Sequence, residues 1–143
     1  QKVIIWATYV HNIHEIIGKL SEKYGSESVV SIYGEVSQQD RMVAVDRFQK
    51  DPKCRFFVGN PTTGGYGLTL TAAKYVIYYS NNYNLEVRLQ SEDRAHRIGQ
   101  TKNVVYIDII AKDTIDERIV QALKKKIQLS AKTLGDKAKD WLL

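Results

Sequence analysis

A segment rich in glycine and threonine, Pro61-Thr62-Thr63-Gly64-Gly65-Tyr66-Gly67-Leu68, contains groups that bind anions. Closely spaced glycines let a backbone approach a ligand, and successive exposed N–H groups form a nest that suits phosphate. The hydroxyls of Thr62 and Thr63 add further donors. The spacing matches neither a Walker A loop nor a dinucleotide fingerprint. A phosphate-binding loop and a plain strand-to-helix connection with positive φ angles are therefore both open.

A second candidate site is the charged segment from Gln90 to Gln100. In a helix, Gln90, Arg94 and Arg97 fall at i, i+4 and i+7 and share one stripe. Two guanidinium groups on one face can grip a phosphoryl group bidentately and stabilise charge on a transferring γ-phosphate. The alternative is a solvated helix face on which neighbouring carboxylates pair with the arginines. From the arginine pair alone, the alternative is favoured.

The remaining polar residues indicate no further catalytic chemistry. The chain has three histidines and one cysteine, Cys54, which argues against a structural zinc site, and we expect no metal ligands. We interpret His96 as a hydrogen-bonded structural residue. The lysine run Lys124-Lys125-Lys126 is typical of a solvated helix face, with a phosphate contact as a secondary possibility.

Length and composition indicate one globular domain that does not span a membrane. The 143 residues allow a single domain with its own core. No stretch approaches the roughly 18 apolar residues of a membrane helix. The net charge of +5 is compatible with a nucleic-acid partner. Because an apolar run starts two residues after Gln1, we expect the chain to be an excised part of something longer.

Short apolar runs alternate with amphipathic segments along the whole chain. The runs predict strands at 3–7, 29–33, 55–58, 75–79 and 104–110, and the segments between them predict helices at about 13–24, 37–50 and 85–97, with a last helix after Thr114. Strands that are almost continuously apolar are typical of a parallel sheet with helices on both faces. In such α/β folds ligands bind beyond the carboxyl ends of the strands. We therefore expect Gly64-Gly65 and the two arginines to lie near that same edge.

Two helices carry start signals of the capping-box type. In the first, Ser37 is followed three residues later by Asp40, and the helix should turn three side chains inward, namely Met42, Val45 and Phe48. In the second, Thr114 is followed by Glu117, and four apolar side chains share a face at i+4 spacing, namely Ile115, Ile119, Leu123 and Ile127.

The stretch QSEDRAHRIGQ, residues 90–100, closely resembles the most diagnostic motif of the SWI/SNF-type DNA-dependent ATPases of helicase superfamily two. The GGYGLTL segment, the opening KVIIW strand and the DTIDERI segment continue the resemblance in the right order. The resemblance covers about residues 2–135. It implies the C-terminal lobe of a two-lobed motor, an α/β RecA-like three-layer sandwich with a mostly parallel sheet. We place this lobe at 1–135 and a tail at 136–143.

The resemblance also implies where ATP and its Mg²⁺ bind. In that family ATP sits between the two lobes, and the Walker A and B residues belong to the N-terminal lobe; this chain contains neither motif. We expect no cofactor and no hydrolysis in the isolated lobe. By resemblance Arg94 and Arg97 reach the γ-phosphate, and Gln90 and Gly67 couple the ATP site to the rest of the motor.

The DNA-binding residues implied by the resemblance lie after the first and third strands, at Thr8, Thr62, Thr63, Gly64 and Gly65. The expected function is ATP-driven translocation on double-stranded DNA, with the N-terminal lobe of the same polypeptide and DNA as partners. The alternative is a stand-alone RecA-like module that binds DNA or protein without ATPase activity. We expect the isolated lobe to be monomeric. Its compact form favours a cytoplasmic bacterial or phage protein, and a eukaryotic member would be nuclear.

Overall fold

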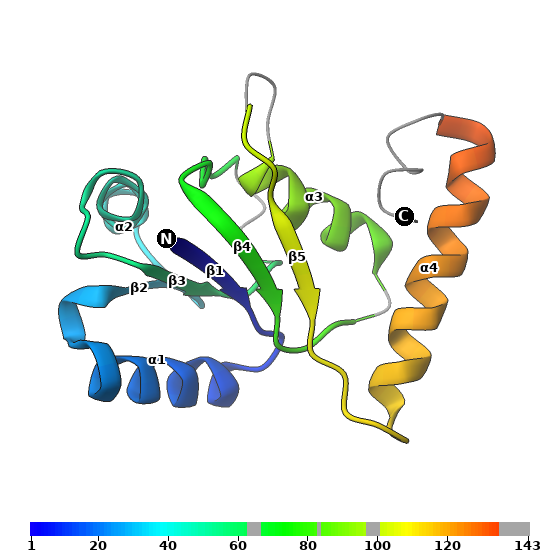
Figure 1. Cartoon of the computed structure of the whole chain (residues 1–143), viewed down its shortest axis with the longest axis horizontal. Coiled ribbons are helices and arrows are strands. Elements are labelled where there is room, and N and C mark those ends of the chain that lie inside the picture. Colours follow the sequence, from blue (N-terminus) through cyan, green and yellow to red (C-terminus); the bar gives the residue numbers. More distant parts are fainter. Residues whose placement is uncertain (63–66, 83, 97–100, 135–143) are drawn as a thin grey trace.

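The described residues form one parallel sheet of five strands in the order β2-β3-β1-β4-β5 (Figure 1). The computed structural model describes residues 1–62, 67–82, 84–96 and 101–134, with side chains as far as Leu129. The strands are β1 (Lys2–Trp6), β2 (Val29–Ile32), β3 (Phe56–Gly59), β4 (Ala73–Tyr78) and β5 (Val105–Asp108). The predicted parallel α/β sheet is confirmed, and the predicted tail at 136–143 lies outside the described residues.

Helices lie on both faces of the sheet, which gives the three layers (Figure 1). They are α1 (Val10–Tyr24), α2 (Gln38–Lys50), α3 (Leu85–Ala95) and α4 (Ile115–Leu134), with a short 3-10 turn, η1 (Ser26–Ser28), before β2. On one face α1 packs Ile13 against Val58 and Ala7. On the other face Phe48 of α2 and Ala95 of α3 belong to a core around Trp6. No helix in the described residues is both long enough and apolar enough to span a membrane.

The last strand differs from the expectation of a buried strand. Val105 and Ile107 are both 41% exposed, because β5 is the edge strand and α1 lies against β2 and β3 instead. Only alternate residues of β5 face inward, and Tyr106 packs on the core beside α3. The apolar run at 104–110 therefore contains a strand that packs on the core with only one of its two faces.

Helix α2 begins as predicted, but one of its inward residues was predicted wrongly. The amide of Asp40 donates to the Ser37 hydroxyl at 3.1 Å, which caps the helix. Phe48 is fully buried and Val45 packs against the core, whereas Met42 is 66% exposed. The buried stripe runs through Ala44 and Phe48 at i, i+4 spacing, so Met42 lies at its outer margin.

The ends of the last two helices also differ from their predicted positions. Thr114 caps α4, but its hydroxyl accepts from the amide of Asp116 at 3.3 Å, not from that of Glu117. Ile115 is 61% exposed because it occupies the first turn of α4, before the helix reaches the core. The predicted α3 ran to about Arg97, whereas the helix ends at Ala95, where His96 leaves helical φ and ψ.

We expect Phe48→Ala to lower the free energy of unfolding by about 3–5 kcal/mol, because it empties a fully buried aromatic site. Met42→Ala on the same helix should change it by less than about 0.5 kcal/mol. Urea denaturation of the two variants measures both effects. Equal losses would contradict the packing of α2 described here.

Candidate functional site

The carboxyl ends of three neighbouring strands bring together a polar edge linked by hydrogen bonds. Thr62 follows β3, Thr8 follows β1 and Ser80 follows β4. The amide of Thr62 donates to Asn60 Oδ1 at 2.8 Å, and Asn60 Nδ2 donates to the carbonyl of Thr8 at 3.1 Å. The amide of Thr8 donates to Ser80 Oγ at 2.8 Å. These bonds connect the ends of β3, β1 and β4 in a continuous chain.

The two threonines of this edge present different groups to solvent. Thr62 is exposed, so its hydroxyl can reach a ligand directly. The hydroxyl of Thr8 is buried and has no hydrogen-bond partner among the described residues. It borders a hollow of about 10 Å³, which also touches Pro61 and Asn81 and has room for about one water molecule. A DNA contact by the Thr8 hydroxyl would therefore require its side chain to turn.

Directly beneath this edge lies a buried guanidinium, that of Arg88 in the first turns of α3. Arg88 is 3% exposed. Its Nη1 and Nη2 donate to the two carboxylate oxygens of Asp108 at 2.6 and 3.1 Å. Its Nη1 also donates to Asn81 Oδ1 at 2.7 Å, and its Nε donates to Glu92 Oε1 at 2.8 Å. Helix α3 is thereby fastened to the residues that end β5 and follow β4.

The ring of Tyr78 forms the floor of this cluster. The guanidinium carbon of Arg88 lies 3.5 Å from the centroid of that ring, which adds a cation–π contact. The Tyr78 hydroxyl shares a hydrogen bond of 2.6 Å with Ser91 Oγ, and Ser91 Oγ donates to the carbonyl of Arg88. Strand β4 and helix α3 are thus joined by polar groups where an apolar contact would be usual.

Burial and charge shift the pKa values of this cluster. Burial alone would lower the pKa of Arg88, but the hydrogen bonds to Asp108 and the nearby negative charge outweigh it and raise that pKa above its ordinary value. Burial raises the pKa of Tyr78, so its hydroxyl stays protonated well into the alkaline range. Both groups therefore hold one charge state around neutral pH.

Arg94 lies away from the edge that carries Thr8 and Thr62, contrary to the expectation that both sites share it. Because β4 and β5 are parallel, α3 begins at their carboxyl edge and must run back toward their amino ends. Arg94, in its last turn, is 8% exposed. Its carbonyl accepts from the amide of Leu70, three residues before β4 begins. A solvated helix face is therefore the wrong interpretation for Arg94.

The other predicted site residues are partly outside the described chain. Gln90 is exposed, and its amide donates to Glu86 at 3.3 Å. Gly67 has a φ of +68°, a conformation that glycine adopts without steric cost. The remaining predicted residues, Thr63, Gly64, Gly65 and Arg97, lie outside the described residues. The predicted stripe of Gln90, Arg94 and Arg97 therefore remains a prediction.

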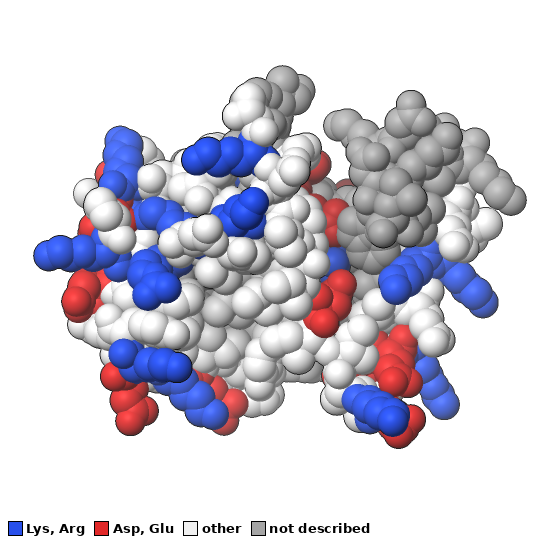
Figure 2. Space-filling view, in the orientation of Figure 1, with Lys and Arg blue, Asp and Glu red and all other residues white. Residues whose placement is uncertain are grey.

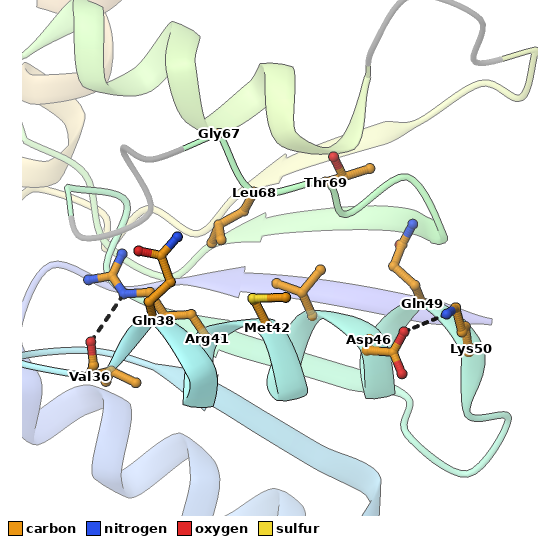
Figure 3. Close-up of a pocket in the computed structure, with 11 residues that line it drawn as sticks. Val36, Gln38, Arg41, Met42, Asp46, Gln49, Lys50, Gly67, Leu68 and Thr69 are labelled. Carbon is orange, nitrogen blue, oxygen red and sulfur yellow. Dashed lines mark hydrogen bonds and ion pairs between the residues drawn. The ribbon is translucent and has the colours of Figure 1, made fainter.

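Gly67 borders a groove of about 1070 Å³ between α2 and residues 67–69 (Figure 3). Met42 and Leu68 give it an apolar floor, and Arg41 stands at one end, where its Nε donates to the carbonyl of Val36 at 3.4 Å. Thr8, Thr62 and Arg94 do not line it. The groove is therefore separate from the polar edge.

The basic side chains do not gather at the polar edge either. Figure 2 shows Lys and Arg side chains collected over α2 and the amino ends of β1 and β3. Lys50, Lys53 and Arg55 are exposed at this amino edge, and Lys50 pairs with Asp46 at 2.7 Å. The net charge of +5 therefore gives no support for placing DNA at the carboxyl edge.

No group of three or more His, Cys, Asp or Glu in the described parts of the chain could hold a metal ion.

Sequence reasoning missed the cluster around Arg88. In the structure, the buried face of α3 is formed by small and polar residues, namely Arg88, Ser91, Arg94 and Ala95. Leu85 and Leu89 of the same helix are only half-buried. An arginine at i and a serine at i+3 on the face that also carries Ala95 could have indicated a polar buried stripe.

We expect Tyr78→Phe to reduce the loss of stability at alkaline pH. An unfolded tyrosine loses its proton near the ordinary pKa of 10.0, whereas folded Tyr78 keeps its proton because its pKa is raised. The free energy of unfolding should therefore fall as pH rises above 10, by up to about 1.4 kcal/mol per pH unit from this group. Denaturant unfolding at several alkaline pH values should give a shallower slope for the variant.

Tyr79→Phe is the control, because it changes the neighbouring ring and leaves the Tyr78 hydroxyl in place. It should keep the wild-type slope. Identical slopes for Tyr78→Phe and wild type would show that the Tyr78 hydroxyl is not held in a buried site.

Comparison with known proteins identifies the family. Residues 1–99 match the helicase conserved C-terminal domain. The chain is 34% identical over 140 residues to the ATP-dependent helicase FUN30 of Saccharomyces cerevisiae, covering 96% of this chain and 12% of that protein. It is 33% identical to the chromatin-remodeling ATPase INO80 of Candida albicans over 79% of this chain and 8% of that protein.

Two solved structures share the fold. The C-terminal part of the Fun30 ATPase domain superposes with a TM-score of 0.78 at 31% identity, covering 86% of this chain and 39% of that one. The Sulfolobus solfataricus SWI2/SNF2 ATPase core in complex with double-stranded DNA gives a TM-score of 0.70 at 31% identity, covering 90% and 26%.

The chain therefore spans only a small part of the length of these relatives. None of the relatives named here is bacterial or viral, so they give no support to a bacterial or phage origin. The family model, the sequence identity and the fold agree with one another. The chain belongs to the helicase conserved C-terminal domain family and is the C-terminal lobe of a SWI2/SNF2-type helicase-like ATPase.

Proposed function

We propose that this chain is the half of an ATP-driven translocase that contacts double-stranded DNA and completes the ATP site of a partner lobe. The observation that carries the proposal is the polar edge formed by the ends of β3, β1 and β4, whose hydrogen bonds continue into the helix that bears Arg94. The similar SWI2/SNF2 core in complex with double-stranded DNA supports the same assignment.

In this proposal the nucleotide binds mainly to the N-terminal lobe of the same polypeptide. Phosphoryl transfer needs a phosphate cradle and a magnesium ion, and this chain carries no Walker motif. Arg94 and Arg97 supply guanidinium groups to the γ-phosphate when the lobes close, and Gln90 and Gly67 connect that site to the lobe. ATP and Mg²⁺ are held mainly by the N-terminal lobe.

The DNA backbone binds along the carboxyl edge through neutral donors. Hydroxyls and backbone N–H groups are common phosphate ligands, and they fix a protein on DNA without reading its sequence. Thr62 is exposed at this edge and contacts a phosphate directly, together with Thr63, Gly64 and Gly65. Thr8 belongs to the same surface through its backbone, which is bonded to Asn60 and Ser80. The similarity to the chromatin-remodeling ATPase INO80 of Candida albicans favours a nuclear location.

We expect Arg97→Lys to abolish most DNA-stimulated ATP turnover in the full-length protein. Lysine keeps the charge but lacks the planar guanidinium, whose N–H groups can donate two parallel hydrogen bonds to a phosphate. An arginine that reaches the γ-phosphate in this way contributes on the order of 10³–10⁵ in rate. Arg94→Ala should be similarly harmful. ATP affinity should change much less, because the other lobe holds most of the nucleotide. Steady-state turnover and nucleotide titration measure the two effects.

The isolated lobe is the control for this experiment and should not hydrolyse ATP. Near-normal turnover by Arg97→Lys, or reproducible turnover by the lobe alone, would overturn the assignment. A full-length protein that binds DNA without any ATP turnover would favour the stand-alone binding module instead.

We expect Thr62→Val to weaken duplex DNA binding severalfold and to leave the salt dependence unchanged, because a lost neutral contact releases no counterion. Lys53→Gln is the matched control at the opposite edge and should change neither quantity. Duplex titrations of the full-length protein at low and moderate salt measure both. A weaker affinity and a salt slope reduced by about one in Lys53→Gln would place the DNA on the basic amino edge.

A further inference from the structure

The polar edge and Arg94 lie at different ends of α3, so any communication between them needs a physical connection. Arg94 occupies the last turn of α3, and Arg88 lies in its second turn. They are six positions apart, which corresponds to a rise of about 9 Å along the helix axis. A helix of three turns is stiff over this length, so a displacement of the Arg88 end is carried to the Arg94 end.

Four hydrogen bonds and one step along the backbone connect the exposed edge to Arg88. The connection starts at Thr62, passes through Asn60 and the backbone of Thr8, and reaches Ser80 at the end of β4. The next residue along the chain is Asn81, whose side-chain oxygen accepts from Arg88 Nη1. Every link is between 2.7 and 3.1 Å.

Arg88 is suited to hold this connection because the hydrogen bonds of its side chain join α3 to β5 and to the residue that follows β4. Asp108 belongs to β5, Asn81 follows β4, and Glu92 belongs to α3 itself. Asn81 Nδ2 also donates to Asp108 Oδ1 at 2.8 Å, which closes the cluster. The planar fork of an arginine can satisfy all three partners at once, whereas a lysine ammonium cannot reproduce that geometry.

We propose that Arg88 is a positioning residue that couples DNA at the carboxyl edge to the placement of Arg94 at the far end of α3. The inference rests on the proposed function, since it assumes that DNA binds at this edge and that Arg94 serves the ATP site. Arg88 contacts neither ligand. It holds α3 in the position that the ends of β4 and β5 dictate.

The test is the ratio of ATP turnover at saturating duplex DNA to turnover without DNA, measured on the full-length protein. Arg88→Lys should lower this ratio about tenfold, within the range of ordinary allosteric coupling. Ser80→Ala should lower it about threefold, because it removes a single neutral hydrogen bond. The double variant should fall no further than Arg88→Lys alone, because both changes interrupt the same connection.

Tyr106→Phe is the matched control. It removes a hydrogen bond from the Tyr106 hydroxyl to the carbonyl of Glu92, at the same junction of β5 and α3 but outside the connection. The control should keep the wild-type ratio. An equal fall in Tyr106→Phe would show that general loosening of α3 is responsible and would overturn the inference.

The remaining outcomes separate this inference from the proposed function. If wild type responds to DNA and Arg88→Lys keeps its ratio, the inference fails and the proposed function stands. If wild type shows no response to DNA, the proposed function fails and the inference fails with it. If Arg88→Lys does not fold, Ser80→Ala decides alone, and a wild-type ratio in that variant overturns the inference.

Discussion

A bidentate ion pair between the buried Arg88 and the partly exposed Asp108 fixes α3 where β4, β5 and α3 meet. A guanidinium that is 3% exposed must have every donor direction used or shielded, because an uncompensated buried charge is costly. Asn81, Glu92 and the ring of Tyr78 meet that requirement. The position of α3 is therefore set by directional polar contacts, which fix a helix more narrowly than apolar packing of similar area.

The parallel topology separates the polar edge from Arg94. Parallel strands place Thr62 and Thr8 at the carboxyl edge, and the crossover from β4 to β5 carries Arg94 away from it. Thr62 lies at the edge, whereas the amide of Leu70 donates to the carbonyl of Arg94. Helix α3 thus runs from the carboxyl edge to the end that bears Arg94, and the buried guanidinium of Arg88 anchors it to Asp108.

Much of the architecture could be predicted because parallel strands are buried on both faces and appear as continuous apolar runs. The same rule failed for β5, an edge strand whose Val105 and Ile107 are half covered. Met42 and Ile115 were predicted to face the core because of their helical spacing alone. Spacing does not show which side of an apolar helix face a neighbouring element covers. Thr8 and Thr62 were predicted as site residues that follow the first and third strands. Arg88 was missed because a charged residue on a helix is normally exposed to solvent.

The most direct test is a structure of the two-lobed ATPase with duplex DNA and a non-hydrolysable ATP analogue. We expect the Thr62 hydroxyl within about 3 Å of a DNA phosphate oxygen. We also expect Arg94 or Arg97 at the γ-phosphate and the Arg88–Asp108 pair intact between them. DNA bound to Lys53 and Arg55 at the amino edge, or a nucleotide remote from the end of α3, would contradict both proposed roles.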